Sequence, residues 1–316
     1  MKKVLAAISL VVAAGWASAG AGSAQEMAKE ALASLPPGTI RLESASPARL
    51  RTLPNYAALR QQYVGPRLRA LEESFVRLGV RESDINEVVL GWRPGASTME
   101  LAGFVSGRFT AKSIAERAGA EGIASTTVGN LPAFCLGTGG VHSCLVVLRD
   151  SLGMFGSEAA LGEMLLVREG NAPNLSTDER FARLMGEAAT QAPIWGVAVD
   201  AAVPDFFRAW MPSQGNIQLD WAKAFQSVEA LVYSVETVDS VRLDVKLDCT
   251  NDQSAENTRQ VFEGLRMVQQ MAWQGMNPGK PNPFQSLEIA RDRSRLSLKM
   301  TTSYADLQSL NPTGGM

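Results

Sequence analysis

Two cysteines and the single histidine of the chain lie together in the segment FCLGTGGVHSC, residues 134–144. Cysteine and histidine side chains bind zinc and copper ions, form redox-active pairs and close disulfides, so the spacing has to decide between these uses. The chain has three cysteines in all, and this segment therefore holds most of its thiol and imidazole groups. It is the first place to look for chemistry.

The pair Gly139-Gly140 favours a two-residue hairpin turn, because both central positions of a type I′ turn need a positive φ angle. Counting outward from that turn places Cys135 opposite Cys144 at a non-hydrogen-bonded position of an antiparallel pair. Cα atoms at such positions lie about 4.5 Å apart, which suits a disulfide. We therefore predict a cross-strand disulfide between these cysteines, worth a little under about 3 kcal/mol for so short a loop.

Two other uses of the segment stay open. His142 shares a sheet face with both cysteines in this register, so the three side chains could hold a metal ion, but a fourth ligand is missing nearby. A redox-active pair usually has the spacing Cys-x-x-Cys at a helix start, which differs from the spacing here. We favour the structural disulfide. The third cysteine, Cys249, lies on the apolar face of a predicted strand and is expected to be a buried thiol.

Most known catalytic motifs are missing from the sequence. With one histidine, placed near a hairpin turn, nucleophile-plus-base arrangements lack their base. There is no G-x-S-x-G elbow, no H-E-x-x-H motif and no phosphate-binding loop. We therefore predict no catalytic residue, no cofactor and no metal. The remaining acid–base candidates are carboxylates in positions typical of solvated helix faces, loops and helix starts: Glu72, Glu73, Glu82, Asp84, Glu87, Asp178 and Glu179.

The N-terminus has the layout of a secretory signal peptide. Two lysines precede the uncharged apolar stretch 4–14, and small residues follow with cleavage points after Ala19, Ala21 or Ala24. The apolar stretch is shorter than the roughly 20 residues that a membrane-spanning helix needs. We predict that residues 1–24 are a cleaved signal peptide, and that the mature chain is periplasmic or secreted and has no transmembrane segment.

The charge of the mature chain argues against nucleic-acid binding. Without the two lysines of the signal segment it has 28 basic and 32 acidic side chains, whereas a dedicated nucleic-acid binder needs a basic footprint. One segment departs from this balance, because residues 41–81 hold eight arginines and three acids. That excess could face an anionic envelope polymer or a lipid headgroup, or be an ordinary solvated helical face. The arginines singled out for an anionic partner are Arg49, Arg51, Arg60, Arg67, Arg69 and Arg77.

The elements that carry these residues follow one plan twice. The order β-α-β-β-α-β-β is predicted for residues 25–150 and again for residues 193–316, with a helical connector at 151–192 between them. The clearest strand is SVRLDVKLDC, residues 240–249, in which apolar and charged side chains alternate. Such alternation predicts one buried and one wet face. The predicted fold is therefore α+β, with two related halves, antiparallel sheets and helices packed on one face.

The segment NLSTDERFARLMGEAATQAPIWGVAVDAAV resembles a recurring segment of uncharacterised, secreted bacterial proteins of duplicated α+β form. A helix precedes a tryptophan-containing strand that ends in aspartate, and the matching positions are Leu175, Phe181, Trp195 and Asp200. The resemblance covers about 30 residues of the chain and implies an exported α+β fold. The family has no assigned chemistry, so the resemblance transfers no site.

These observations predict an exported, non-catalytic binding or interaction protein of the bacterial cell envelope. Its expected partner is an envelope protein or an anionic envelope polymer. Two alternatives stay open. One is a carboxylate-dependent extracytoplasmic hydrolase, whose two acids would meet only in the folded chain. The other is a carrier of an apolar ligand, held between the helices and the sheet.

Overall fold

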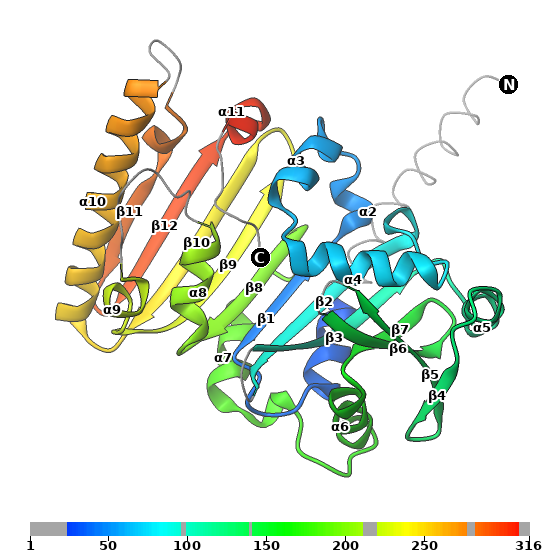
Figure 1. Cartoon of the computed structure of the whole chain (residues 1–316). Helices are drawn as coiled ribbons and strands as arrows, with labels where there is room; N and C mark the ends of the chain where they lie inside the picture. Colours follow the sequence, from blue (N-terminus) through cyan, green and yellow to red (C-terminus); the bar gives the residue numbers. More distant parts are fainter. Residues whose placement is uncertain (1–23, 96–98, 139–140, 211–219, 277–281, 310–316) are drawn as a thin grey trace, which may run out of the picture.

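The computed structural model describes residues 24–95, 99–138, 141–210, 220–276 and 282–309 (Figure 1). The predicted signal peptide, apart from Ala24, lies outside the described residues, and so does the Gly139-Gly140 turn. The described strands form one antiparallel sheet of twelve, in the order β11-β12-β10-β9-β8-β1-β2-β3-β7-β6-β5-β4.

The strands are short to medium in length and carry the labels of Figure 1. They are β1 (Arg41–Ala45), β2 (Ile85–Pro94), β3 (Met99–Gly107), β4 (Ser125–Val128), β5 (Leu131–Thr138), β6 (Val141–Arg149), β7 (Leu152–Gly156), β8 (Ile194–Val199), β9 (Val228–Thr237), β10 (Val241–Cys249), β11 (Glu288–Asp292) and β12 (Arg295–Thr302).

Residues 24–34 form a helix ahead of β1. The labelled α-helices are α2 (Pro47–Leu50), α3 (Tyr56–Tyr63), α4 (Pro66–Arg77), α5 (Ala111–Ala120), α6 (Glu158–Arg168), α7 (Glu179–Glu187), α8 (Ala202–Trp210), α9 (Trp221–Ala224), α10 (Asp252–Met276) and α11 (Tyr304–Ser309). Short 3-10 helices are η1 (Glu82–Asp84), η2 (Leu175–Thr177) and η3 (Pro283–Ser286).

Strands β1 and β8 lie side by side at the middle of the sheet and pair antiparallel, although about 150 residues separate them in the chain (Figure 1). Outward from this pair the strand order is similar on both sides. On one side β1 is followed by β2, β3 and β7, and on the other β8 is followed by β9, β10 and β12. The ends differ, because three further strands follow β7 whereas only β11 follows β12.

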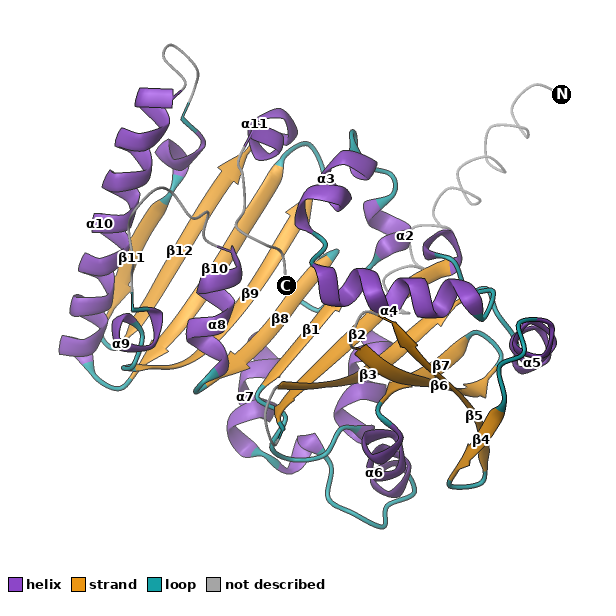
Figure 2. Cartoon of the chain, viewed as in Figure 1, coloured by secondary structure: helices purple, strands orange, loops and turns teal. Residues whose placement is uncertain are grey.

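Helices cover both faces of the central strands, which corrects the expectation of helices on one face. The helix 24–34, α6 and α7 pack on the face that includes Val89 and Val197. Helices α4, α5, α8 and α10 pack on the other face, against residues such as Leu90 and Leu231, and Figure 2 shows α4 and α8 crossing the near side. The reason is visible in the sequence of β8, IWGVAV, which is apolar at every position and so must be covered on both sides.

Toward the β11 end of the sheet, the described helices cover one face only. In β10 the residues Val241, Val245 and Leu247 are buried, whereas Arg242 and Lys246 are exposed. Helix α10 contacts the apolar face of this part of the sheet through Phe262 and its neighbours. The alternation predicted for residues 240–249 is therefore confirmed.

The structure corrects two predicted elements. The helical connector expected from residue 151 begins with a strand, since β7 lies between β3 and β6 and all five of its residues are buried. The order predicted for residues 25–150 ends in two strands, whereas the structure has three, because the chain turns at Gly129, where φ is +58°, between β4 and β5. Both errors arose from glycine-containing segments too short to show a clear period.

Within the described part of the chain, no helix combines the length and the apolar character that crossing a bilayer requires.

Candidate functional site

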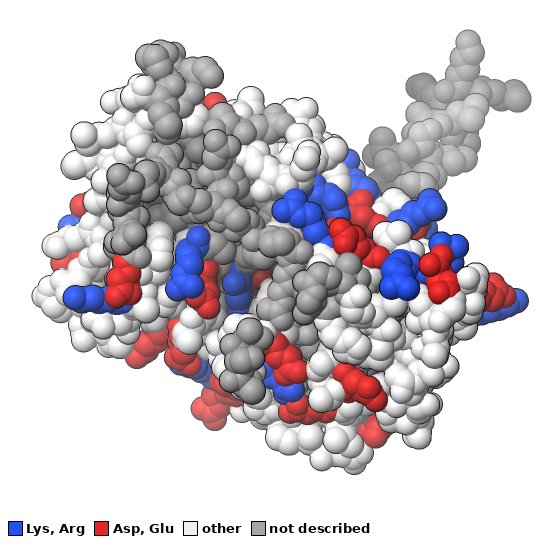
Figure 3. Space-filling view, viewed as in Figure 1, with Lys and Arg blue, Asp and Glu red and all other residues white. Residues whose placement is uncertain are grey.

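The arginine-rich segment is folded into α2, α3 and α4, and η1 follows it directly. Helix α4 crosses the near face of the sheet (Figure 2), and Figure 3 shows basic side chains with acidic ones among them on that part of the surface. One of its eight arginines is not at the surface, because Arg41 belongs to β1 and is buried. The side chain of Arg67 lies outside the described residues. Of the other predicted positions, two are held by nearby acids, two face solvent, and Arg49 donates to a backbone carbonyl.

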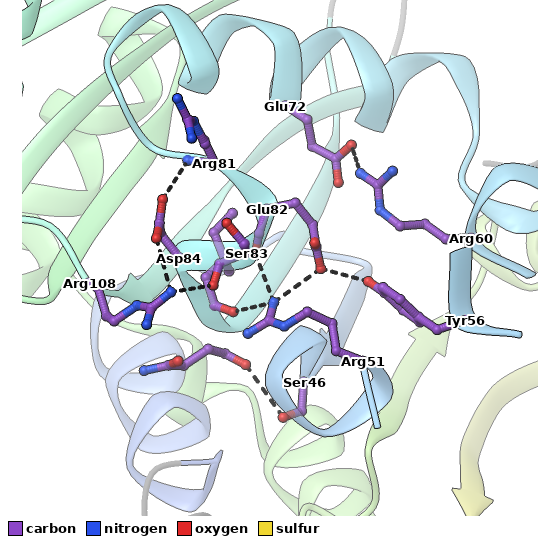
Figure 4. A network of polar contacts seen from close by, with 12 residues as sticks. Ser46, Arg51, Tyr56, Arg60, Glu72, Arg81, Glu82, Ser83, Asp84 and Arg108 are labelled. Carbon is purple, nitrogen blue, oxygen red and sulfur yellow. Dashed lines mark hydrogen bonds and ion pairs between the residues drawn. The ribbon is translucent and has the colours of Figure 1, made fainter. Parts of the chain in front are cut away.

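Glu82 of η1 organises the first group (Figure 4). The Arg51 guanidinium donates from Nη1 to the Glu82 backbone carbonyl at 2.8 Å, to the Glu82 carboxylate at 3.1 Å and to the Ile85 carbonyl at 3.1 Å. The Tyr56 hydroxyl donates to the same carboxylate at 2.7 Å. Burial and this hydrogen bond raise the pKa of Tyr56, so the phenol keeps its proton and remains a donor.

Arg60 and Glu72 form the second half of this network. The Arg60 guanidinium of α3 donates to the Glu72 carboxylate of α4, and both side chains are partly buried. Burial raises the pKa of Glu72; Arg60 opposes the shift, and the nearby charge of Glu82 adds to it. Arg51 and Arg60 therefore neutralise acids of their own segment, which ties α2 and α3 to η1 and α4.

The second group of arginines faces solvent along α4. Arg69 and Arg77 are exposed, and between them lie Glu73, which is exposed, and Val76, whose residue surface is 47% exposed. Positions 69, 73, 76 and 77 share one side of a helix because they are spaced by three, four, seven and eight residues. Arg81 follows, also exposed. We call Arg69, Glu73, Val76, Arg77 and Arg81 the α4 surface. It has three arginines and one acid.

Arg49 is less available than this group. Its guanidinium donates to the Gln191 carbonyl, just before β8, and the residue is half-buried. Arg69 also makes one internal hydrogen bond, from Nη1 to the Gln61 carbonyl at 3.0 Å, which fixes its direction without neutralising its charge.

A second polar group is buried under the near face of the sheet, at the β1–β8 seam. Arg41 donates from Nη2 to the Glu43 carboxylate at 2.6 Å, and the Tyr233 hydroxyl donates to the same carboxylate oxygen. The Arg41 guanidinium also lies 5.8 Å from the ring centroids of Trp92 and Phe206. Burial and the Glu43 charge raise the pKa of Tyr233 well above its ordinary value, so the phenol stays protonated.

Gly196 makes this buried cluster possible. The register places Glu43 opposite Gly196 and Gly196 opposite Tyr233, so one line crosses β1, β8 and β9. A Cβ atom on Gly196 would lie 2.4 Å from Cε1 of the Tyr233 ring. The missing side chain in β8 therefore lets the tyrosine lie across that strand and reach the carboxylate.

The other buried carboxylate is Glu87 in β2. Its partner is Ser46, whose hydroxyl donates to the Glu87 carboxylate at 2.8 Å. Ser46 directly precedes α2, a position where serine commonly caps a helix, but its side chain makes no capping bond. Burial raises the pKa of Glu87 to about 7, although the Ser46 hydrogen bond and Arg49 oppose the shift.

Glu43 and Glu87 do not face each other. Directly paired residues of neighbouring strands share a face, so Glu43 lies on the same face as its partner Leu90. Glu87 lies two residues from Val89 and therefore shares the opposite face with it. Among the described residues these two are the buried carboxylates. They cannot serve as a facing acid–base pair across one cleft. Sequence reasoning named Glu87 but missed the Glu43 cluster, since only the pairing of β1 with β8 brings Tyr233 near.

The hairpin of β5 and β6 has the register predicted from the glycine pair. Cys135 pairs with Cys144 and Gly137 with His142, and a disulfide joins the two cysteines. The Cα atoms lie 3.9 Å apart, closer than the typical non-hydrogen-bonded pair. Cys249 is a buried free thiol, as expected from its place in β10. The hairpin is therefore stapled at the end of the sheet formed by β4, β5 and β6.

The four residues that carry the resemblance to secreted bacterial proteins have structural roles. Leu175, Phe181 and Trp195 are fully buried in one apolar core beneath the sheet. Asp200 receives a two-point ion pair from Arg180, with 2.9 Å between Nη1 and Oδ1. The pattern therefore fixes α7 against β8 and marks no site.

The fold and these sites define a class rather than an activity: an α+β protein with one large antiparallel sheet, helices on both faces of its centre and one cross-strand disulfide. The sequence matches no family model, and no curated protein matches it.

Solved structures of the same fold do exist. Crystal form III of the Treponema protein TP0453 is similar to 88% of this chain and 96% of its own, with a TM-score of 0.52 and 12% sequence identity. Crystal form I of TP0453 gives a TM-score of 0.51 at 11% identity, over 88% and 95% of the two chains. At such low identity the likeness shows the fold alone.

Proposed function

We propose that this chain is an exported, non-catalytic binding protein of the bacterial cell envelope, and that the α4 surface binds an anionic envelope polymer. The observation that carries the proposal is the division of the arginines into two groups. Arg51 and Arg60 hold the framework by pairing with Glu82 and Glu72, whereas Arg69 and Arg77 stay exposed on one helix face. Fixed cations in front of a rigid polar network are suited to attract a polyanion.

An extracytoplasmic location has two supports. The first 24 residues have the composition of a signal peptide. The Cys135–Cys144 disulfide is compatible with an oxidising compartment, where such bonds persist. Fractionation of cells that produce the full chain tests this part: the mature chain should leave the cytoplasm, shortened at Ala19, Ala21 or Ala24. Full-length chain retained in the cytoplasm would contradict it.

Binding is tested with a matched pair of polymers, dextran sulfate and unsulfated dextran of the same length. The mature protein should be retained on immobilised dextran sulfate at low salt, be released as salt rises and pass through unsulfated dextran. Screening weakens the attraction between exposed charges over about 10 Å at 0.1 M salt, so the release should be steep. Equal retention on both polymers, or none on either, would contradict a polyanion-binding role.

One observation favours a second function, a carboxylate-dependent hydrolase. Burial raises the pKa of Glu72 and the nearby charge of Glu82 adds to the shift, and glycosidases use two neighbouring carboxyl groups. Both acids, however, are engaged by Arg60 and Arg51. Screening the mature protein against glycosidic substrates distinguishes the two: turnover abolished by both Glu72→Gln and Glu82→Gln would replace the binding proposal.

We also propose that residues 25–150 and 193–316 are two related units joined through residues 151–192. The support is the strand order, which is similar when read outward from β1 and from β8. Separate production of each unit tests the division. Units that fold only when mixed would fit an interface made by the β1–β8 pairing, and a unit that folds alone would show that this pairing is dispensable.

A further inference from the structure

The hairpin that carries the disulfide brings three metal-binding side chains together. Cys135 and Cys144 face each other across β5 and β6, and His142 lies two residues before Cys144 along β6, on the same face. The ligand atoms of these three residues all lie within 4.8 Å of one another. Among the described residues, no other group of three cysteine, histidine or acidic side chains has its ligand atoms this close together.

We propose that reduction of the Cys135–Cys144 disulfide converts this hairpin into a binding site for Cu⁺, held by two thiolates and the His142 imidazole. Thiolate and imidazole are ligands that soft metal ions select. Three ligands suit Cu⁺, whereas a structural Zn²⁺ site takes four, and no fourth cysteine, histidine or acid joins the cluster in the described chain.

The conversion needs a reductant, and its balance is simple. A dithiol transfers two electrons and two protons to the disulfide, so one sulfur–sulfur bond becomes two thiols while the dithiol closes its own disulfide. Binding of Cu⁺ then displaces the two thiol protons, since the metal takes thiolates. Exchange with another disulfide, which takes up the two electrons and becomes a dithiol, would close the Cys135–Cys144 bond again and release the ion, because a disulfide sulfur is no longer a thiolate.

The burial of the three residues suits such a site. Cys144 is fully buried, Cys135 is half-buried and His142 is exposed, so the ion would enter from the solvent side and meet sulfurs shielded from water. The backbone holds both cysteines in adjacent strands by the ladder of β5 and β6, and this ladder does not depend on the sulfur–sulfur bond. Reduction should therefore leave the two thiols side by side.

The test uses the mature protein with Cys249→Ser, so that the only remaining thiols are those of the hairpin. After reduction, and without oxygen, Cu⁺ is titrated in competition with a coloured Cu⁺ chelator. One equivalent should bind, and the oxidised protein should bind none. Because His142 is the only histidine, its imidazole signals in the NMR spectrum report on this site alone and should shift with the same stoichiometry.

One variant tests whether the imidazole of His142 is a ligand or whether the two thiols bind copper without it. His142→Ala keeps the disulfide and should weaken Cu⁺ binding at least tenfold after reduction. Ser125→Ala, at an exposed position of β4 at the same end of the sheet, should bind as the parent does. Far-UV circular dichroism of the reduced protein shows whether the sheet persists.

Four results would overturn the proposal. They are no Cu⁺ binding by the reduced protein, equal binding by the oxidised protein, unchanged affinity in His142→Ala, and loss of the fold on reduction. Tight binding of Zn²⁺ with no gain for Cu⁺ would contradict the choice of metal.

Discussion

At the scale of single residues, the two buried carboxylates have opposite surroundings. Glu43 accepts hydrogen bonds from a cation and a phenol, whereas Glu87 has a serine hydroxyl and a more distant arginine. Loss of a donor leaves a buried carboxylate oxygen without its hydrogen-bond partner, and a buried carboxylate whose only donor is neutral is favoured in its protonated form. The two residues should therefore respond differently to mutation and to pH.

Tyr233→Phe should lower the free energy of unfolding by about 1.5–3 kcal/mol, because it removes a hydrogen bond to the buried, charged Glu43 carboxylate. Tyr304→Phe is the matched control, since the Tyr304 hydroxyl donates at the surface to the Val238 carbonyl at 3.3 Å. That control should change stability by less than about 0.5 kcal/mol. Urea denaturation of the two variants compares them, and equal effects would show that the buried hydrogen bond contributes nothing special.

Glu87 should make stability depend on pH. Its pKa in the folded chain is raised to about 7 from an ordinary value of 4.5, so the folded state binds the proton more tightly than the unfolded state. This stabilisation is complete below about pH 4.5 and is lost as pH rises through about 7. A tenfold difference in proton affinity corresponds to about 1.4 kcal/mol, so the stabilisation amounts to at most about 3.5 kcal/mol. Glu87→Gln should remove this pH dependence.

The control is Glu73→Gln, which removes an acid from the exposed side of α4. Its stability curve between pH 4.5 and 8 should run parallel to that of the parent. If the Glu87→Gln curve is also parallel, Glu87 is not the group responsible.

Sequence reasoning at this scale succeeded where spacing alone determines a contact. The Cys135–Cys144 pairing follows from counting outward from two glycines, and the structure has that register. It failed where a contact spans the sheet. Ser46 has the type and place of an N-cap, yet its hydroxyl turns to Glu87 because the serine lies opposite that strand, a relation that no local pattern contains.

At the scale of elements, strands with clear alternation were predictable and glycine-containing strands were not. The charged and apolar positions of β10 identify both its faces. Strand β7, with the sequence LGMFG, is short and lies wholly inside the sheet, so it shows no alternation. The helix at residues 24–34 was also missed, because its apolar side chains follow directly on the apolar signal segment.

Gly196→Ala should destabilise the chain by about 1–3 kcal/mol, because the new Cβ would lie 2.4 Å from Cε1 of the Tyr233 ring and push it away from Glu43. Gly264→Ala is the control, since a Cβ there, on the exposed side of α10, meets nothing within 4 Å. The control should stabilise the chain by about 0.5–1 kcal/mol through helix propensity. Thermal unfolding measures both, and a neutral Gly196→Ala would contradict the packing account.

At the scale of the whole molecule, the central pairing of β1 with β8 makes one sheet from both halves of the chain. The sequence predicted the order of elements in the second half and most of it in the first, but not this pairing, because nothing in either strand marks the other as its neighbour. Burial of both faces at the seam is its consequence, and the Arg41–Glu43–Tyr233 cluster lies in the same place. This buried cluster is therefore separate from the α4 surface, to which we assign binding.

The α4 surface owes its position to two ion pairs, Arg51–Glu82 and Arg60–Glu72. The end of α2 is held to η1 by the Arg51–Glu82 pair, and α3 is held to α4 by the Arg60–Glu72 pair, so the exposed arginines do not rest on a loose segment. The sequence indicated the excess of arginine but could not tell which side chains would be neutralised. Of the six singled out, Arg69 and Arg77 are the described ones that face solvent fully enough to meet a large partner.

The most direct measurement is the affinity of the mature protein for dextran sulfate in two double variants of equal charge. Arg69→Ala with Arg77→Ala removes two cations from the α4 surface, and Arg242→Ala with Lys246→Ala removes two from the wet face of β10. The first pair should weaken binding about 5- to 30-fold, as expected for two exposed charge contacts, and the second should leave it nearly unchanged. Equal weakening by both pairs would show that net charge, and not the α4 surface, is responsible for binding.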